Sequence, residues 1–233
     1  IEFIRQSPSP ILRPCAILAK VYQPLANELF NAAFISIWDE LFDLNSSELS
    51  VQDDMPLING LETALRSPQI PPYIRAALLN LTEFMDMQDK PIPLDILLLA
   101  KQAEAASMFS KCLSYREMEF NSQNCLPSGE CVEALIIVNN ELGLRDAASG
   151  VLQCVKSNYK HIRIEPFWLE KLNRWQEAKE SYLQDSVKWK QQYPDDSPAQ
   201  HDDWMTSELG LLRCLHALGD YEDLTHSALQ MKE

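Results

Sequence analysis

Residues 24–44 decide the fold, and they read PLANELFNAAFISIWDELFDL. The apolar residues recur at steps of three and four, at Leu25, Leu29, Phe30, Ala33, Phe34, Ile37, Trp38, Leu41 and Phe42. This spacing predicts one broad apolar stripe on a long helix, with Pro24 in its first turn, where a missing N–H costs nothing. Residues 11–22 are also apolar at helical spacing. They predict a preceding antiparallel helix, joined by a tight turn at Gln23 and Pro24.

The same pattern continues along most of the chain. Apolar stripes of helical period occur in 56–65, 73–87, 94–106, 107–120, 130–142, 146–159, 167–172, 175–191, 204–218 and 222–231. Polar or proline-containing stretches interrupt them at 45–54, 89–93 and 193–203. No useful stretch alternates with period two, and the chain has only 6 glycines, few for a protein built from hairpins. The sequence therefore predicts an all-α fold.

The helix connections indicate how the helices are arranged. Gly143, Asn173 and Gly219 each follow an apolar helix and can adopt the left-handed conformation that ends helices. A small or apolar residue follows each turn at a similar distance, at Ala147, Ala178 and Leu224. This is typical of tetratricopeptide-type repeats, but the turns are 30 and 46 residues apart, against about 34 in a regular array. We expect an irregular α-solenoid of antiparallel helix pairs that must stack on neighbours.

Composition argues against several classes of function. The formal net charge of −14 disfavours nucleic-acid binding, which depends on basic phosphate contacts. No apolar run approaches the roughly 20 residues of a membrane span, so we expect no direct membrane insertion. The cysteines are scattered, without a CxxC pair, at Cys15, Cys112, Cys125, Cys131, Cys154 and Cys214. This spacing suits reduced, buried thiols of a cytoplasmic protein better than disulfides or a metal site.

Motifs for catalysis or cofactor binding are missing from the sequence. Neither GxGxxG nor GxxxxGK[ST] occurs, and the kinase motifs DFG and HRD and the nucleophile motif GxSxG are also absent. The four histidines lack obvious carboxylate partners, and the pairs Asp195-Asp196 and Asp202-Asp203 fall in an expected solvated loop. We therefore predict no catalytic, cofactor-binding or metal-binding residues.

Several stretches resemble one family closely. The first are IEFIR at 1–5, PSPILR at 8–13, AKVYQPLA at 19–26 and LFNAAF at 29–34. Further matches follow in order at 79–85 (LNLTEFM), 115–120 (YREMEF), 147–152 (AASGVL), 168–172 (WLEKL), 175–178 (WQEA) and 213–219 (RCLHALG). Together they resemble the target-of-rapamycin (TOR) kinases, where the middle HEAT region gives way to the FAT domain. Two stretches, 45–54 and 184–203, depart from the family pattern.

The resemblance implies a non-catalytic scaffold segment of a giant serine/threonine kinase that controls cell growth in response to nutrients. It implies a HEAT-like helix pair over 1–50 and the N-terminal, TPR-like part of the FAT domain over 51–233. In that family the FAT solenoid clamps and restrains the kinase domain. Implied partners are that domain and other parts of the same long chain, other subunits of a TOR complex and an activating small GTPase. The implied location is the cytoplasm, with recruitment to lysosomal or vacuolar surfaces through partners.

The predicted structural and regulatory residues are Ala147, Ala178, Tyr182, Leu183, Cys214 and Leu215. Ala178 is expected at a close helix crossing, with Cys214 packed in the neighbouring repeat. The chain begins at Ile1 and stops inside a helical pattern, so we expect a piece of a longer polypeptide.

An alternative is a free-standing TPR-type adaptor that binds peptide segments of partner proteins. Such a groove needs clustered bases, and the one dense set here is Lys171, Arg174, Lys179, Lys188 and Lys190. These residues fall mostly on apparent outer helix faces, so the adaptor ranks second and an enzyme third.

Overall fold

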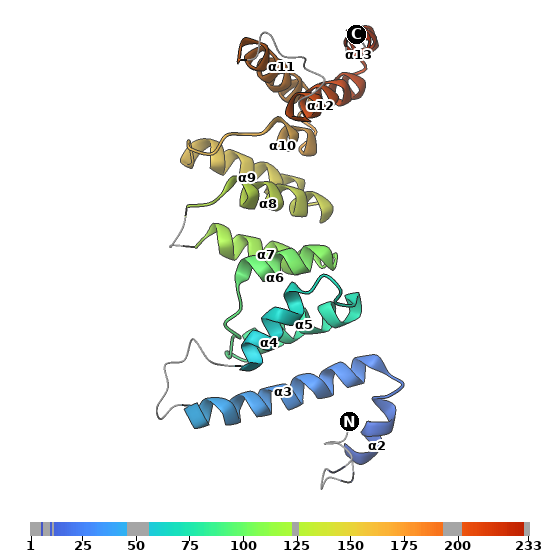
Figure 1. Cartoon of the computed structure of the whole chain (residues 1–233), viewed down its shortest axis with the longest axis vertical. Coiled ribbons are helices and arrows are strands. Elements are labelled where there is room, and N and C mark those ends of the chain that lie inside the picture. The colour runs from blue at the N-terminus through green and yellow to red at the C-terminus, as the bar shows by residue number, and fades with distance from the viewer. Residues whose placement is uncertain are drawn as a thin grey trace. The chain divides into compact units, whose positions relative to one another are not determined.

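The computed structural model describes residues 6, 10, 12–45, 56–122, 126–192 and 202–230. Within these ranges the chain forms twelve α-helices and no strand (Figure 1). The predicted all-α class is therefore confirmed. The chain divides into two compact units, residues 1–108 and 109–233, and each is described by itself.

The described part of the first unit contains five helices. They are α2 (Leu12–Leu18), α3 (Gln23–Asn45), α4 (Pro56–Arg66), α5 (Pro72–Met87) and α6 (Ile96–Ala105). α5 contacts α3, α4 and α6, and α4 also contacts α6. Pro72 occupies the first position of α5, where no N–H is needed, and the Asp95 carboxylate caps α6 by accepting a hydrogen bond from the N–H of Leu97 (3.1 Å).

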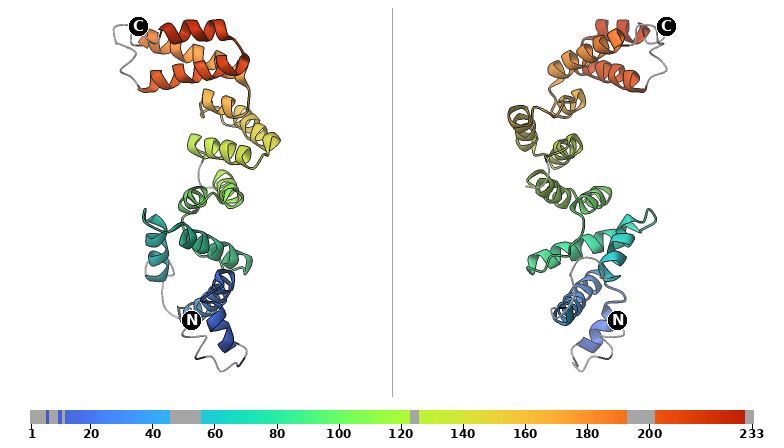
Figure 2. Two further views of the ribbon diagram at one scale, coloured as in Figure 1. Left: turned by 90° about the vertical axis from the view of Figure 1, so that its right-hand side faces the viewer. Right: turned by 60° about the vertical axis from the view of Figure 1, so that its left-hand side comes forward.

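Seven helices lie in the ranges of the second unit that the structure describes. They are α7 (Phe109–Phe120), α8 (Gly129–Glu141), α9 (Arg145–Asn158), α10 (Pro166–Lys171), α11 (Trp175–Gln192), α12 (Asp202–Leu218) and α13 (Tyr221–Gln230). Each helix packs on the next in sequence from α7 to α13, except that α10 packs back on α8 rather than on α9 (Figure 2). α10 also contacts α12. This packing of consecutive helices is that of an α-solenoid, as predicted.

The three predicted helix stops are confirmed. Gly143, Asn173 and Gly219 have φ values of 73°, 56° and 79°, in the left-handed region. Two further stops were not predicted: Asp89 (φ 58°) follows α5, and Ser107 (φ 55°) follows α6. In each case a backbone N–H just beyond the helix returns to a carbonyl of its last turn, as from Arg174 to Leu169 (2.9 Å).

Two predicted boundaries are wrong. The first helix ends at Leu18, not near Tyr22, because the chain turns through residues 19–21 by short-range hydrogen bonds such as Lys20 N–H to Ile17 O (3.2 Å). Gln23 then begins α3 instead of forming the turn. Asp202 and Asp203 were assigned to a loop, but they form the first turn of α12.

The first unit has an apolar core on the facing sides of α3, α5 and α6. Its buried side chains include Trp38, Leu79, Met85, Leu99 and Ala103. Trp38 stacks on Phe34 with ring centroids 5.9 Å apart. This core is a product of helical periodicity, because each helix contributes residues three or four positions apart.

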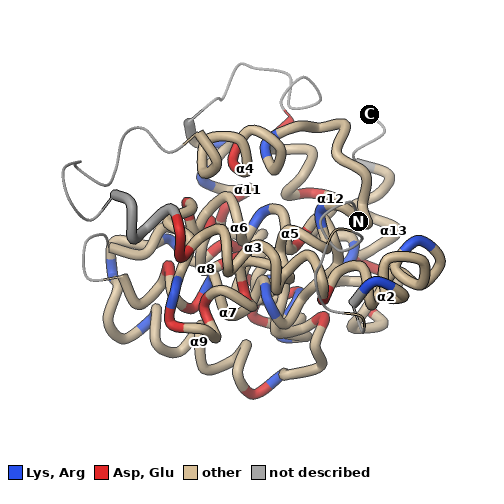
Figure 3. Tube along the Cα trace, turned by 90° about the horizontal axis from the view of Figure 1, so that it is seen from below, with Lys and Arg blue, Asp and Glu red and all other residues tan. Residues whose placement is uncertain are grey.

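Charge and hydropathy add two observations. Acidic and basic residues are interspersed along the helices of both units, without a basic stretch (Figure 3). None of the helices in the described part of the chain combines the length and hydrophobicity needed to cross a membrane. The predicted division into 1–50 and 51–233 concerns family domains and stays a prediction. The boundary between the two compact units, after residue 108, is a different kind of boundary, because it reflects packing within each unit.

Candidate functional site

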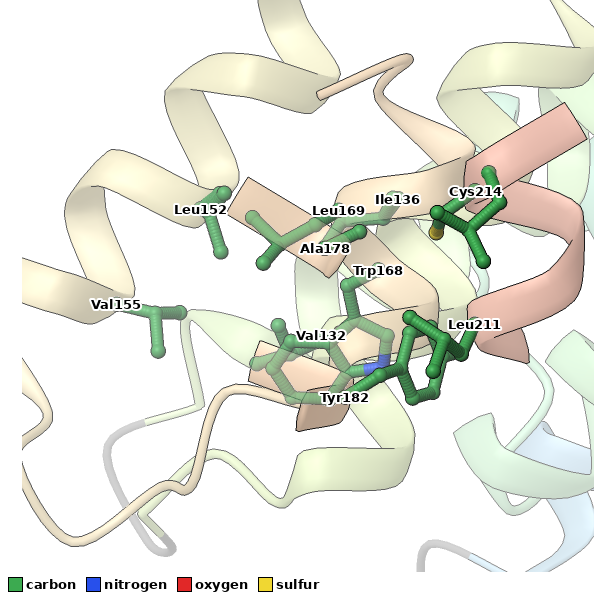
Figure 4. Packing of buried hydrophobic residues seen from close by; sticks show 11 residues of the cluster. Val132, Ile136, Leu152, Val155, Trp168, Leu169, Ala178, Tyr182, Leu211 and Cys214 are labelled. Carbon is green, nitrogen blue, oxygen red and sulfur yellow. The ribbon is translucent and has the colours of Figure 1, made fainter. Parts of the chain in front are cut away.

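Most of the predicted regulatory residues lie in one apolar cluster of the second unit. The cluster draws side chains from α8, α9, α10, α11 and α12 (Figure 4). Its buried members are Val132, Ile136, Leu152, Val155, Trp168, Leu169, Ala178, Tyr182, Leu211, Cys214 and Leu215. Trp168 is the largest of the nearly fully buried side chains. We take this cluster as the candidate site because it joins five helices.

Four of the six predicted residues enter the cluster. Ala178 and Cys214 have no exposed surface, and Tyr182 and Leu215 are also buried. Ala178 and Tyr182 lie one turn apart on the inner face of α11. Leu183 is one residue further, about 100° around the helix, and its side chain is 44% exposed.

Ala147 does not take the position expected of it. It is exposed, and the next residue, Ala148, is fully buried instead. Ala148 shares a face of α9 with Leu152 and Val155, at steps of four and three, and both of these are buried. The buried alanine of α9 is therefore one position after the predicted Ala147.

A buried carboxylate beside the cluster was not predicted. Glu170 on α10 is only 7% exposed. It accepts hydrogen bonds from Nε and Nη2 of Arg213 on α12 at 2.9 and 3.0 Å, and another from the hydroxyl of Tyr182 on α11. Planar, two-point binding of a carboxylate by arginine is both strong and directional. Glu170 therefore fixes three helices to one another.

The protonation of this network follows from its surroundings. Burial, with the hydrogen bond to Glu170 as the next cause, raises the pKa of the Tyr182 phenol. The hydrogen bond to Glu170 is the main cause that raises the pKa of Arg213. Both shifts mean that near neutral pH Tyr182 is a neutral donor and Arg213 is a cation. The arrangement suits a structural tie and supplies no proton-transfer group.

Two buried thiols of the second unit, those of Cys131 and Cys214, are poorly suited to nucleophilic chemistry. Burial raises the pKa of Cys214 to about 11 and that of Cys131 to about 12. The nucleophilic form of cysteine is the thiolate, which is scarce at neutral pH when the pKa is so high. Cys214 therefore acts as a small packing residue, consistent with its place in the cluster to which Ala178 and Leu215 also belong.

Further polar contacts join neighbouring helices around the cluster. The indole N–H of Trp168 on α10 donates to Oε2 of Glu133 on α8 (3.2 Å). Nζ of Lys179 on α11 lies 2.8 Å from the carboxylate of Asp220, just before α13, and this hydrogen bond is the main cause that raises the pKa of Lys179. These contacts extend the tie from α8 to α13.

The basic residues of the adaptor alternative are largely engaged within the chain. Lys188 pairs with Asp185 (3.3 Å) and Arg174 with Glu177 (3.6 Å). Lys179 is held by Asp220, and Lys171 lies 5.0 Å from the ring centre of Phe167. These bases do not form a free cluster for a peptide carboxylate, which disfavours the adaptor.

A hollow of about 650 Å³ lies beside α10, α11 and the start of α12. Its cationic side chains, Arg163 and Lys188, both pair with Asp185, at 2.6 and 3.3 Å. Since the same carboxylate neutralises both cations, the hollow is a poor phosphate site. Within the ranges that the structure describes, no group of three or more His, Cys, Asp or Glu side chains is placed to hold a metal ion.

Comparison with known proteins gives strong matches over nearly the whole chain. Serine/threonine-protein kinase TOR2 of Saccharomyces cerevisiae is 39% identical over 98% of this chain. Serine/threonine-protein kinase TOR of Oryza sativa subsp. japonica is 38% identical, and serine/threonine-protein kinase mTor of Drosophila melanogaster is 36% identical, each over 97%. The chain spans only 8–9% of the length of these relatives. No family model matches it.

Proposed function

Because this chain is homologous over nearly all of its length to one segment of the target-of-rapamycin (TOR) serine/threonine kinases, we propose that it serves such a kinase as a non-catalytic scaffold segment. The observation that carries the proposal is the extent of the match, which takes in 97–98% of this chain and 8–9% of each relative. The described residues are helical and have no kinase fold. In this proposal, phosphoryl transfer belongs to other parts of the long polypeptide.

The proposed action is mechanical. Stacked helices contact mainly their neighbours, so a displacement at one end passes through a series of packed contacts. The ties centred on Glu170 support this action, since they join α10, α11 and α12 directionally. In the intact kinase, the solenoid clamps the kinase domain and restrains its activity.

The proposed partners follow from the same homology. They are the kinase domain and other parts of the same chain, other subunits of a TOR complex, and an activating small GTPase that moves the solenoid. The proposed role is in the control of cell growth by nutrients. The proposed location is the cytoplasm, with recruitment to lysosomal or vacuolar surfaces through partner proteins.

The test is Ala178→Pro in the full-length kinase. The N–H of Ala178 donates to the carbonyl of Arg174 (3.0 Å), and proline removes this bond. A proline beyond the first turn also kinks the helix and costs ~3 kcal/mol or more. We expect the loosened solenoid to release the kinase domain, so basal activity towards a peptide substrate rises.

Gln176→Pro is the matched control. Gln176 is exposed and lies in the first turn of α11, where proline is tolerated, so activity should stay near that of the unaltered kinase. A folded Ala178→Pro kinase with unchanged or reduced basal activity would contradict the restraining role.

A further inference from the structure

Gly210 lies in the middle of α12 and is buried. A Cβ atom at this position would lie 2.6 Å from both Cε1 and the hydroxyl oxygen of Tyr182 on α11. Real Cβ atoms essentially never come so close to another heavy atom, so the end of the tyrosine ring occupies the space that any side chain at residue 210 would need. Glycine inside a helix costs about 1 kcal/mol relative to alanine, and here it permits this approach.

The end of the ring that faces Gly210 is also held by a hydrogen bond. The Tyr182 hydroxyl donates to Glu170, which is bound at two points by Arg213. Gly210 and Arg213 are three residues apart and so share one face of α12. α12 therefore supplies both the seat for the ring and the cation that holds the ring's hydrogen-bond acceptor.

The Tyr182 ring cannot move away from Gly210 without losing its hydrogen bond to Glu170. Tyr182 is 5% exposed, and moving the ring end away from Gly210 displaces the hydroxyl from Glu170. Removing one partner from a buried hydrogen bond leaves the other unsatisfied, which costs more than the bond itself contributes. The seat and the hydrogen bond are thus lost together.

We propose that Tyr182 seated on Gly210 is a size-matched latch that sets the closed packing of α10, α11 and α12, and that opening it weakens the restraint on the kinase domain. The second half of this proposal rests on the function proposed above. The latch is a conformational device, and neither residue takes part in catalysis.

The experiment compares Gly210→Ala, Tyr182→Leu and the double variant in the full-length kinase. Hydrogen exchange measured by mass spectrometry reports the packing of α12, and phosphorylation of a peptide substrate reports basal activity. We expect Gly210→Ala to speed exchange in α12 by about tenfold or more, because local opening no longer has to break a buried, charge-assisted hydrogen bond. We also expect it to raise basal activity severalfold.

The double variant tests the size match specifically. Leucine lacks the distal half of the tyrosine ring, so the alanine methyl group meets no ring atoms in the double variant. Tyr182→Leu alone already loses the hydrogen bond to Glu170, and adding Gly210→Ala to it should therefore change exchange little further. If Gly210→Ala fails to fold, recovery of folded protein in the double variant supports the latch equally. Gly150→Ala is the control: Gly150 is exposed in α9 with no atom within 4 Å of a built Cβ, so it should change neither measurement.

The outcomes separate the latch from the proposed function. Unchanged exchange in Gly210→Ala, or a double variant in which the effects of the two single substitutions simply add, overturns the latch whatever the activity does. Faster exchange in Gly210→Ala, with little further increase when Gly210→Ala is added to Tyr182→Leu and constant kinase activity throughout, supports the latch and overturns the restraint of the kinase domain.

Discussion

The two compact units join their helices in different ways. In the first unit, α3, α5 and α6 are held by apolar side chains such as Trp38, Leu79 and Met85, and the ion pair between Lys90 and Asp39 is partly exposed. Among the described residues, the buried charged side chains all lie in the second unit, at Arg116, Glu170 and Glu208. Apolar burial is non-directional, whereas a buried carboxylate needs each donor in place.

The difference indicates where single substitutions act most sharply. An apolar core loses stability in proportion to the volume removed and tolerates swaps of similar shape. A directional network fails when one partner is removed, even if the volume is unchanged. The second unit should therefore respond more sharply to isosteric changes of a charged side chain, since all the buried charged residues of the described ranges lie there.

The largest effect is expected from Cys214→Arg in the second unit. Cys214 has no exposed surface, so arginine would place extra volume and a charge in the apolar cluster, at a cost of about 4 kcal/mol or more. Hydrogen exchange in the full-length kinase should show loss of protection in α10 and α12. Cys154→Arg, at a half-buried site on α9, is the control and should cost much less. Equal effects at the two cysteines would argue against the cluster as the critical point.

A smaller effect is expected from Leu79→Ala in the first unit. Leu79 is fully buried on α5, and truncation should cost about 3 kcal/mol through lost burial and the cavity that remains. Faster amide exchange in α5 and α6 would measure this cost. Met87→Ala on the same helix removes a side chain that is 72% exposed and should change stability by less than about 0.5 kcal/mol. If both variants behave alike, the assigned core of the first unit is wrong.

The smallest of the three effects is expected from Glu170→Gln. The substitution keeps the shape but replaces the acceptor of three hydrogen bonds with an amide, at a cost of about 2 kcal/mol. Exchange in α10 and α12 should rise while their helical content stays the same. Glu177→Gln on α11 breaks only exposed ion pairs and should cost less than about 0.5 kcal/mol. If Glu170→Gln and Glu177→Gln had the same effect on exchange, the hydrogen bonds of Glu170 would not hold the second unit more directionally than apolar packing holds the first.

Most of the fold could be predicted because helical periodicity is local. Each apolar stripe is visible within a few turns, and glycine or asparagine after a stripe indicates a left-handed stop. Asp89 and Ser107 adopt the same left-handed conformation, yet neither residue type is specific for it. From the sequence alone, the left-handed helix ends at these two residues could not be distinguished from ordinary polar turns.

The central ties of the candidate site could not be predicted. Glu170 and Arg213 are 43 positions apart, and no local pattern connects them. Two weak signals were present: Glu170 interrupts the apolar run PFWLEKL, and Gly210 lies inside a helical stripe without ending it. Buried Ala178, Tyr182, Cys214 and Leu215 lie beside these ties, but their regulatory role stays a prediction, as it does for the exposed Ala147 and Leu183.

The left-handed stops after α8, α10 and α12 bear on how such a chain can change over evolutionary time. Each stop is fixed by one residue and two or three backbone hydrogen bonds, so it does not depend on how many residues separate it from the next. Insertions between two stops therefore lengthen the segment between them without disturbing the backbone hydrogen bonds of either stop. For this reason the stops can be 30 residues apart in one place and 46 in another within the same stack. The same independence allows the length between two stops to change in homologous chains.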